Sequence, residues 1–343
     1  MTEQRPVTSR PPLDEGRPPV ALVTGGNGFL GRHLCATLIE AGWQVRSLHR
    51  SPTPALHELG VEERLGDVCD LDQVLSAGQG VDAVYHLAGR VTRSGEALGD
   101  MYTLHIKGTR NVISLVETLK IPRALYLSTS GVVGVHERPV LATEESDYAW
   151  SLIRGWPYYE SKAFAEQEVT RACARGVPFI IARPSLLVGP GDPTGGGHED
   201  VLSVLSGEVR AALPGGLSLV DPRDVARFLP TLMERGEPGV GYLLGGENLT
   251  VRAFVNQIAS FAGLRPPLLD LPETLMKHAG APIKWISKQK AFGGLAPETI
   301  EMGRRFWYID SSQAEALGFV ARPTSETIID ALRDLEDRGF YAR

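Results

Sequence analysis

A glycine-rich stretch, VTGGNGFLG, constrains the fold of this chain more than any other feature of the sequence. It begins at the end of the apolar, β-branched run VALVTG and leads directly into a helical pattern. Gly25, Gly28 and Gly31 follow the spacing G-x-x-G-x-x-G. Glycines at this spacing let the chain turn tightly and approach a pyrophosphate, and the helix N-terminus adds partial positive charge. The stretch also fits G-x-G-x-x-G through Gly26, so the pattern predicts a dinucleotide site without fixing its subtype. We expect the dinucleotide to contact Gly25, Asn27, Gly28, Phe29, Leu30 and Gly31.

Apolar runs and helical patterns alternate along the chain around this turn. Strands are predicted at 20–25, 43–50, 83–89, 124–130 and 179–185. Helices are predicted between them at 29–41, 103–119 and 159–174. Strand, helix and strand at this rhythm indicate a parallel sheet with helices on both faces. We therefore expect an α/β protein with a doubly wound sheet of the Rossmann type.

The alternation loosens from residue 186 onward. The stretch GPGDPTGGG reads as a loop, although GVGYLLGG still reads as one more buried strand. We predict a smaller C-terminal lobe that is interleaved with the main sheet. The predicted parts are a disordered tail over 1–18, a dinucleotide-binding domain over 19–185 plus about 224–250, and a substrate-binding lobe over about 186–223 plus 251–343.

Charge and composition argue against several functions. The net charge of -6 and the absence of a long Lys/Arg run argue against a nucleic-acid partner. The three cysteines are far apart and lack C-x-x-C spacing, which predicts neither a disulfide framework nor a zinc site, and no metal is expected. No apolar run reaches the roughly 18 residues of a membrane span. We expect a cytoplasmic protein that acts on a small molecule and has no integral membrane segment.

The end of the second predicted strand should meet the adenosine ribose of a bound dinucleotide. An acidic residue there selects a free 2′-hydroxyl, whereas an arginine accommodates a 2′-phosphate. This chain reads SLHRS, with Arg50 and no carboxylate. The sequence therefore favours NADP(H), with NAD(H) as the alternative if Arg50 only stacks on adenine. Asp67 and Val68, in GDVCD, are expected to seat the adenine ring.

Two adjacent tyrosines, Tyr158 and Tyr159, stand at the start of a predicted helix. Helical spacing places Tyr158 on an apolar face with Lys162, Ala165, Val169 and Ala172. Tyr159 shares a more polar face, expected to point outward, with Ala163, Glu166 and Thr170. An ammonium one turn away should lower the phenol pKa from near 10, so Tyr158 is predicted to move a proton and Tyr159 to be a spectator. The pattern alone recurs by chance in helices, and the glycine turn upstream makes it informative.

Five stretches carry a resemblance to a known family: TGGNGFLG, YHLAG, LSTSGVVG, YYESK and ARPSLLVGPGD. Their order and spacing resemble the extended short-chain dehydrogenase/reductases, the NAD-dependent epimerase/dehydratase superfamily, over about residues 20 to 319. The stretches GGLSLVDPRDVA, GYLLGGENLTVRAF and YIDSSQAEALGF look most like its dihydroflavonol-reductase and 3β-hydroxysteroid-dehydrogenase-like branch. The resemblance implies an NAD(P)-dependent oxidoreductase of CH–OH and C=O groups, for which a homodimer would be usual.

The same resemblance implies roles for individual residues. Tyr158 would be the general acid/base, with Lys162 gripping the nicotinamide ribose. Counting back from Gly134, the substrate-binding hydroxyl falls on Thr129, with Ser130 as the alternative. Further cofactor contacts are implied at Leu87, Ala88, Gly89, Pro184 and Ser185.

One position departs from the family pattern. The family usually carries asparagine in N-x-x-G-T, where this chain reads HIKGT with His105. That asparagine braces the helix and supports a water relay to the lysine. His105 has ring nitrogens able to do the same, and the alternative is a buried histidine satisfied by hydrogen bonds.

Three functions are compatible with these motifs. The first is an NADPH-dependent carbonyl reductase or alcohol dehydrogenase for a bulky apolar or cyclic substrate. The second is a nucleotide-sugar epimerase or dehydratase with tightly bound NAD, which Arg50 and Leu217 disfavour, and the third is a non-catalytic NADPH sensor. An apolar pocket is suggested by Trp150, Trp156 and Val188, although the tryptophans could instead pack in a lid.

Overall fold

The computed structural model describes residues 16–91, 98–192, 198–207, 209, 211–270 and 297–341. Most of the predicted N-terminal tail lies outside these residues. Within them, a parallel sheet has the strand order β10-β6-β5-β4-β1-β2-β3. Its strands are β1 (Val20–Thr24), β2 (Gln44–His49), β3 (Glu62–Leu65), β4 (Ala83–His86), β5 (Ala124–Leu127), β6 (Phe179–Pro184) and β10 (Gly241–Leu244). The strand order reverses at β1, where ligands of such sheets bind at the carboxyl ends, and the predicted Rossmann-type fold is confirmed.

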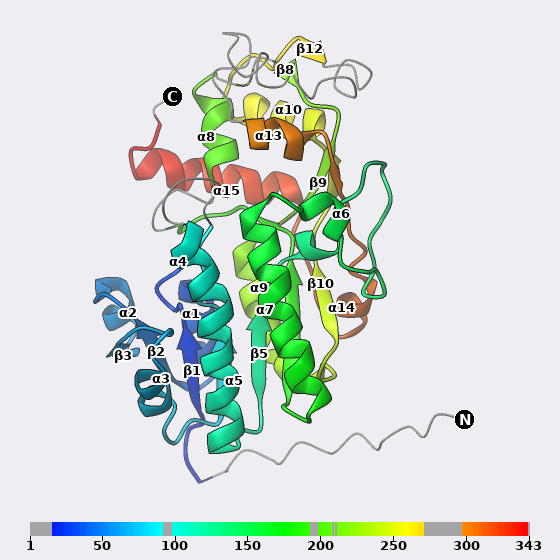
Figure 1. Ribbon diagram of the computed structural model, residues 1–343. Helices are drawn as coiled ribbons and strands as arrows, with labels where there is room; N and C mark the ends of the chain where they lie inside the picture. The colour runs from blue at the N-terminus through cyan, green and yellow to red at the C-terminus, as the bar shows by residue number, and fades with distance from the viewer. Residues whose placement is uncertain are drawn as a thin grey trace.

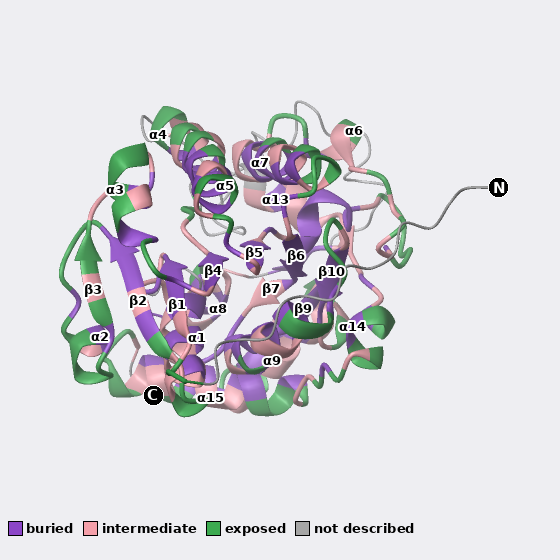
Figure 2. Ribbon diagram, turned by 90° about the horizontal axis from the view of Figure 1, so that it is seen from below, coloured by how far each residue is buried: buried purple, intermediate pink, exposed green. Residues whose placement is uncertain are grey.

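Helices cover both faces of this sheet, as Figure 2 shows. One face is buried against α1 (Phe29–Glu40) and α9 (Pro222–Arg235). The other is buried against α3 (Leu71–Ala77), α5 (Gly108–Leu119) and α7 (Pro157–Ala174). The sheet therefore lies between two apolar layers, which explains why its central strands read as continuous apolar runs rather than alternating ones.

The predicted elements differ from the observed ones mainly at their ends. The strands predicted at 83–89 and 124–130 end at His86 and Leu127, because the chain leaves the sheet there to line the ligand crevice. The helix predicted at 103–119 begins as a π-helix, η1 (Thr103–Lys107), before α5. The short elements α2 (Pro54–Glu58), α4 (Leu98–Tyr102), η2 (Ser130–Val132) and α6 (Trp150–Ile153) complete this half.

A second, smaller group of elements lies beyond the carboxyl ends of the strands (Figure 1). Its strand β9 (Gly216–Val220) pairs with β7 (Leu186–Leu187), β11 (Asn248–Thr250) and β13 (Phe306–Trp307). A minor pair is formed by β8 (Ala211–Ala212) and β12 (Leu269–Asp270). The helices of this group are α8 (Glu199–Leu205), α10 (Val251–Phe261), α13 (Pro297–Gly303) and α15 (Thr324–Asp337), whereas α14 (Ser312–Ala316) lies beside β10 of the main sheet (Figure 1). None of the described helices is long and apolar enough to cross a bilayer.

The two groups are interleaved rather than separate. Ala314 and Phe319, in the part predicted as the substrate lobe, are buried in the core beneath the main sheet. The domain boundaries stay a prediction, because the shared core offers no clean division.

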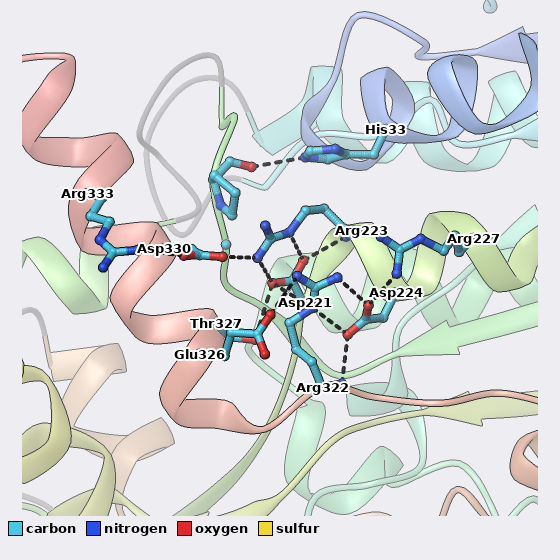
Figure 3. Close-up of polar contacts among 12 residues, drawn as sticks. His33, Asp221, Arg223, Asp224, Arg227, Arg322, Glu326, Thr327, Asp330 and Arg333 are labelled. Atoms are coloured by element: carbon cyan, nitrogen blue, oxygen red, sulfur yellow. Dashed lines mark hydrogen bonds and ion pairs between the residues drawn. The ribbon is translucent and has the colours of Figure 1, made fainter. Parts of the chain in front are cut away.

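An ion-pair network joins α9 to α15 (Figure 3). Arg223 Nη2 lies 2.7 Å from Asp221 Oδ2 and 2.8 Å from Asp330 Oδ2. Arg322 Nη2 lies 2.6 Å from Asp224 Oδ1. Because Asp221 and Asp224 are both buried, these pairs are partly shielded from water and hold α15 against α9.

Candidate active site

The glycine turn between β1 and α1 accepts no side chain at its key positions. Gly25 has φ +74°, and a Cβ there would lie 2.8 Å from the backbone of Ala88. A Cβ on Gly31 would overlap the carbonyl oxygen of Gly25. The N-cap residue Gly28 supplies no side-chain hydrogen bond to the first turn of α1. First-turn N–H groups and the helix dipole are thus left for an anionic ligand, and the turn fits a dinucleotide pyrophosphate.

The residues predicted to seat the adenosine lie around the same crevice. Arg50 is exposed at the carboxyl end of β2. Asp67 turns its carboxylate back to accept a 2.8 Å hydrogen bond from Cys69 N. The Val68 side chain is buried, and its carbonyl accepts a 2.9 Å hydrogen bond from the Asn111 amide. The sequence reasoning missed Asn111, which fixes the adenine-side loop from α5.

A buried histidine braces the floor of the crevice. His86 Nδ1 lies 2.7 Å from Thr24 Oγ1, and His86 Nε2 lies 3.0 Å from Thr109 Oγ1. Thr24 Oγ1 also accepts a 3.2 Å hydrogen bond from Ala88 N, in the predicted 87–89 contact segment. Burial lowers the pKa of His86 to about 3, so the ring is neutral. These bonds tie β1, β4 and α5 together where the dinucleotide would lie.

Tyr158, Lys162 and Thr129 meet at the carboxyl end of β5. A hydrogen bond links Thr129 to the phenol of Tyr158. The Lys162 ammonium donates to the carbonyl of Leu127 and lies 4.5 Å from the ring centroid of Tyr126. Burial lowers the pKa of Lys162 to about 7, and the negative charge of the buried Glu166 opposes this shift.

The expected lowering of the Tyr158 pKa is wrong for this structure. Burial raises the pKa of Tyr158 to about 12, and the hydrogen bond from Thr129 opposes this only in part. The physical reason is that the desolvation that penalises the phenolate also penalises the ammonium of Lys162, whose nearest partner is a backbone carbonyl. Tyr158 is therefore held protonated at neutral pH.

The face predicted for Tyr158 is confirmed, whereas the outer face predicted for Tyr159 is exposed only at Thr170. The four companions of Tyr158 are buried: Lys162, Ala165, Val169 and Ala172. On the supposedly outer face, Ala163 and Glu166 are also fully buried. The ring of Tyr159 packs 5.0 Å from that of Trp307, because the 130–156 segment and β13 cover this side of α7.

An ion pair between Arg183 and Glu166 is buried on the Tyr159 face of α7 and was not predicted from the sequence. Arg183 Nη2 donates a 2.6 Å hydrogen bond to Glu166 Oε1, and the Tyr148 hydroxyl donates to the same oxygen at 2.8 Å. Arg183 directly precedes Pro184, and Glu166 stands one turn after Lys162. The pair thus fixes the Lys162 helix against the strand end that carries Pro184 and Ser185.

Glu166→Gln is expected to lower the free energy of unfolding by about 3 kcal/mol, because it leaves the buried Arg183 guanidinium without its counter-charge. Urea unfolding of the purified variant measures this. The matched control is Glu168→Gln on the same helix, whose partners Arg110 and Arg171 are largely exposed. That change should cost less than about 1 kcal/mol. Equal losses in the two variants would contradict the role assigned to Glu166.

His105 braces the helix that carries Tyr158. Its Nε2 accepts a 3.0 Å hydrogen bond from Arg90 N, so the proton sits on Nδ1, which lies 2.8 Å from Ser161 Oγ. Ser161 Oγ in turn donates to the carbonyl of Tyr158 at 2.8 Å. Burial lowers the pKa of His105 to about 2, so the ring stays neutral. No hydrogen bond among the described residues joins His105 to Lys162, although the charge of Lys162 adds to the lowering of the His105 pKa, and the relay to the lysine stays a prediction.

A cavity of about 350 Å³ opens beside Tyr158 and Thr129. Its walls are mainly apolar and include Trp156, Leu187, Leu217, Phe254, Met302 and Trp307. Trp156 stacks on Trp307 with ring centroids 5.5 Å apart. Three lining hydroxyls, those of Ser128, Ser185 and Ser218, have no hydrogen-bond partner among the described residues.

Two residues predicted for the substrate lie elsewhere. Trp150 packs against Phe164 with ring centroids 5.1 Å apart and does not line the cavity. Val188 is buried in the cluster formed with α8, α10 and α15. The prediction that Val188 contacts the substrate is wrong, because Val188 directly follows β7 and its side chain enters the core of the second lobe rather than the cavity.

The sequence from residue 21 to 245 matches the model of the NAD dependent epimerase/dehydratase family. The chain therefore belongs to this family, the extended short-chain dehydrogenase/reductases, and is an NAD(P)-dependent oxidoreductase. The resemblance described from the sequence motifs is confirmed.

Several relatives are named as reductases. The 2-alkyl-3-oxoalkanoate reductase of Stenotrophomonas maltophilia is 33% identical over 71% of this chain and 75% of the relative. The dihydroflavonol 4-reductase of Hordeum vulgare is 28% identical over 81% of this chain and 84% of the relative. Among solved structures, gox2253 superposes with a TM-score of 0.82 at 30% identity, covering 94% of this chain and 99% of that chain.

Proposed function

We propose that this enzyme is an NADPH-dependent carbonyl reductase, acting in reverse as an alcohol dehydrogenase, for a bulky apolar or cyclic substrate. The observation that carries the proposal is the apolar cavity that opens directly beside Tyr158 and Thr129. Among the described residues, this cavity has no lysine or arginine in its lining. An apolar cavity with a few hydroxyls suits a ketone on a hydrocarbon frame.

The chain's own residues would divide the reaction between them. The glycine turn and Arg50 would hold NADPH, which would supply a hydride when bound. Thr129 holds the carbonyl oxygen of the substrate, and Tyr158 gives its proton to that oxygen as it gains negative charge. Lys162 would grip the nicotinamide ribose, and Tyr158, whose pKa lies far above neutral pH, carries the proton that it gives.

The nucleotide-sugar alternative has weaker support. A sugar nucleotide brings a diphosphate, which proteins bind through cationic or multiple N–H donors. The guanidinium of Arg223, near the lobe interface, is already paired with Asp221 and Asp330. Leu217, an apolar residue, occupies the cavity wall where the sugar enzymes place an arginine.

The test is a nucleotide titration followed by a substrate screen. NADPH and NADH are each titrated against the enzyme by nucleotide fluorescence, and cyclic ketones and UDP-sugars are then assayed at the nicotinamide absorbance band. We expect tighter binding of NADPH, by about tenfold or more, and turnover of apolar ketones. Tightly retained NAD with UDP-sugar turnover and no ketone reduction would overturn the proposal.

A further inference from the structure

We infer that His49 and Glu63 form a clamp that positions the Arg50 loop and thereby sets the preference for a 2′-phosphorylated dinucleotide. This inference rests on the proposed NADPH dependence. It concerns residues 50–52, which leave β2 beside the adenosine end of the crevice and then enter α2. Neither clamp residue belongs to the glycine turn or to the Tyr158 site.

The clamp fastens both ends of this short loop to one carboxylate oxygen. His49, directly before Arg50, places Nε2 2.8 Å from Glu63 Oε2. Thr53, directly after residue 52, donates its backbone N–H to the same oxygen at 2.8 Å. Since His49 and Thr53 are both buried, the loop between them has little freedom and Arg50 is presented outward from a fixed base.

The clamp continues to the pyrophosphate-binding turn. Ser47 Oγ lies 2.9 Å from His49 Nδ1, and a Cβ on Gly26 would overlap that same Ser47 oxygen. Ser47 pairs with Glu63 in the parallel register of β2 and β3, so Ser47, His49 and Glu63 lie on one face of the sheet. One row of contacts thus runs from the glycine turn to the ribose loop.

The charge of Glu63 explains why the clamp affects cofactor choice. Hydrogen bonds from His49 and from Thr53 N lower the pKa of Glu63, so the carboxylate is ionised at neutral pH. While His49 and Thr53 hold the Glu63 carboxylate at β3, its negative charge stays away from the adenosine ribose of a bound dinucleotide. Released, it would repel a 2′-phosphate and could accept hydrogen bonds from a 2′-hydroxyl, as an acidic residue does in NAD-selective sites.

The experiment measures the dissociation constants of NADPH and NADH for full-length variants by nucleotide fluorescence. His49→Asn should weaken NADPH binding about tenfold and change NADH binding less than about threefold, since it removes one charge-assisted hydrogen bond. Glu63→Gln, which keeps an oxygen acceptor for Thr53 N, should retain most of the preference. Glu63→Ala, in the edge strand β3, frees the loop without releasing a carboxylate, so it should weaken NADPH binding by less than His49→Asn does, and it serves if His49→Asn does not fold.

The matched control is Glu62→Gln, the neighbour on β3, which pairs with Arg46 at 2.8 Å outside the loop. It should leave both constants unchanged. Equal weakening of NADPH and NADH in the clamp variants, or no weakening of either, would overturn the clamp alone. A parent enzyme that binds NADH as tightly as NADPH would instead overturn the proposed cofactor.

Discussion

Tyr158→Phe is expected to lower kcat by about 10² to 10⁴-fold, because it removes the only proton that this side chain can give to the carbonyl oxygen. The ring is kept, and the phenol hydroxyl has its hydrogen bond with Thr129 rather than with the glycine turn. The dissociation constant of NADPH should therefore change by less than about threefold. Steady-state kinetics with an apolar ketone and nucleotide fluorescence measure the two effects separately.

Tyr159→Phe is the matched control, one residue further along the same helix. Its ring packing on Trp307 survives the substitution, and most activity should remain. Loss of turnover in Tyr159→Phe together with retention in Tyr158→Phe would contradict the assignment of the proton donor.

Lys162→Met is expected to abolish most of the activity and yet to make the folded protein at least as stable. The ammonium is buried against the Leu127 carbonyl and the Tyr126 ring, and burial disfavours its charge. Replacing such a charge with an apolar chain of similar volume is often stabilising, here by about 1 to 3 kcal/mol. Turnover should fall by about 10²-fold or more.

The stability difference between Lys162→Met and the parent should depend on pH. The pKa of Lys162 is about 7 in the folded chain, below its ordinary value of 10.5. Between these values the unfolded parent binds more protons than the folded one, so the parent loses stability as pH falls through this window. Urea unfolding at about pH 6 and about pH 9.5 should therefore show a larger advantage for the variant at the lower pH. A constant difference, or a larger one at the higher pH, would contradict the buried-ammonium account.

The elements that carry local patterns could be predicted from the sequence. The glycine turn could be predicted because the backbone conformations that it requires are supplied by glycines that are close together along the chain. The apolar face that carries Tyr158 and Lys162 could be predicted because residues four apart in a helix lie on the same side. The polar strand β3, EERL, gives no periodic signal, because it is an edge strand with one open side.

The contacts that tune the site could not be predicted in this way. The second face of α7 looked polar because of Glu166, whose burial depends on Arg183 of a different strand. His86 and Asn111 likewise act on partners from other elements. The pKa of Tyr158 depends on how far the folded chain excludes water, which the spacing to Lys162 does not reveal. Helix spacing predicts which side chains share a face, whereas tertiary packing decides whether that face is covered.

Transfer of deuterium from NADPH labelled at the hydride-donating carbon to an apolar cyclic ketone tests the central claim most directly. Mass spectrometry of the product alcohol should find one deuterium on the former carbonyl carbon for each NADPH oxidised by the parent enzyme, and Tyr158→Phe should reduce the rate of this transfer. Conversion of a UDP-sugar without net oxidation of the nicotinamide, with the ketone left unlabelled and unreduced, would contradict the account.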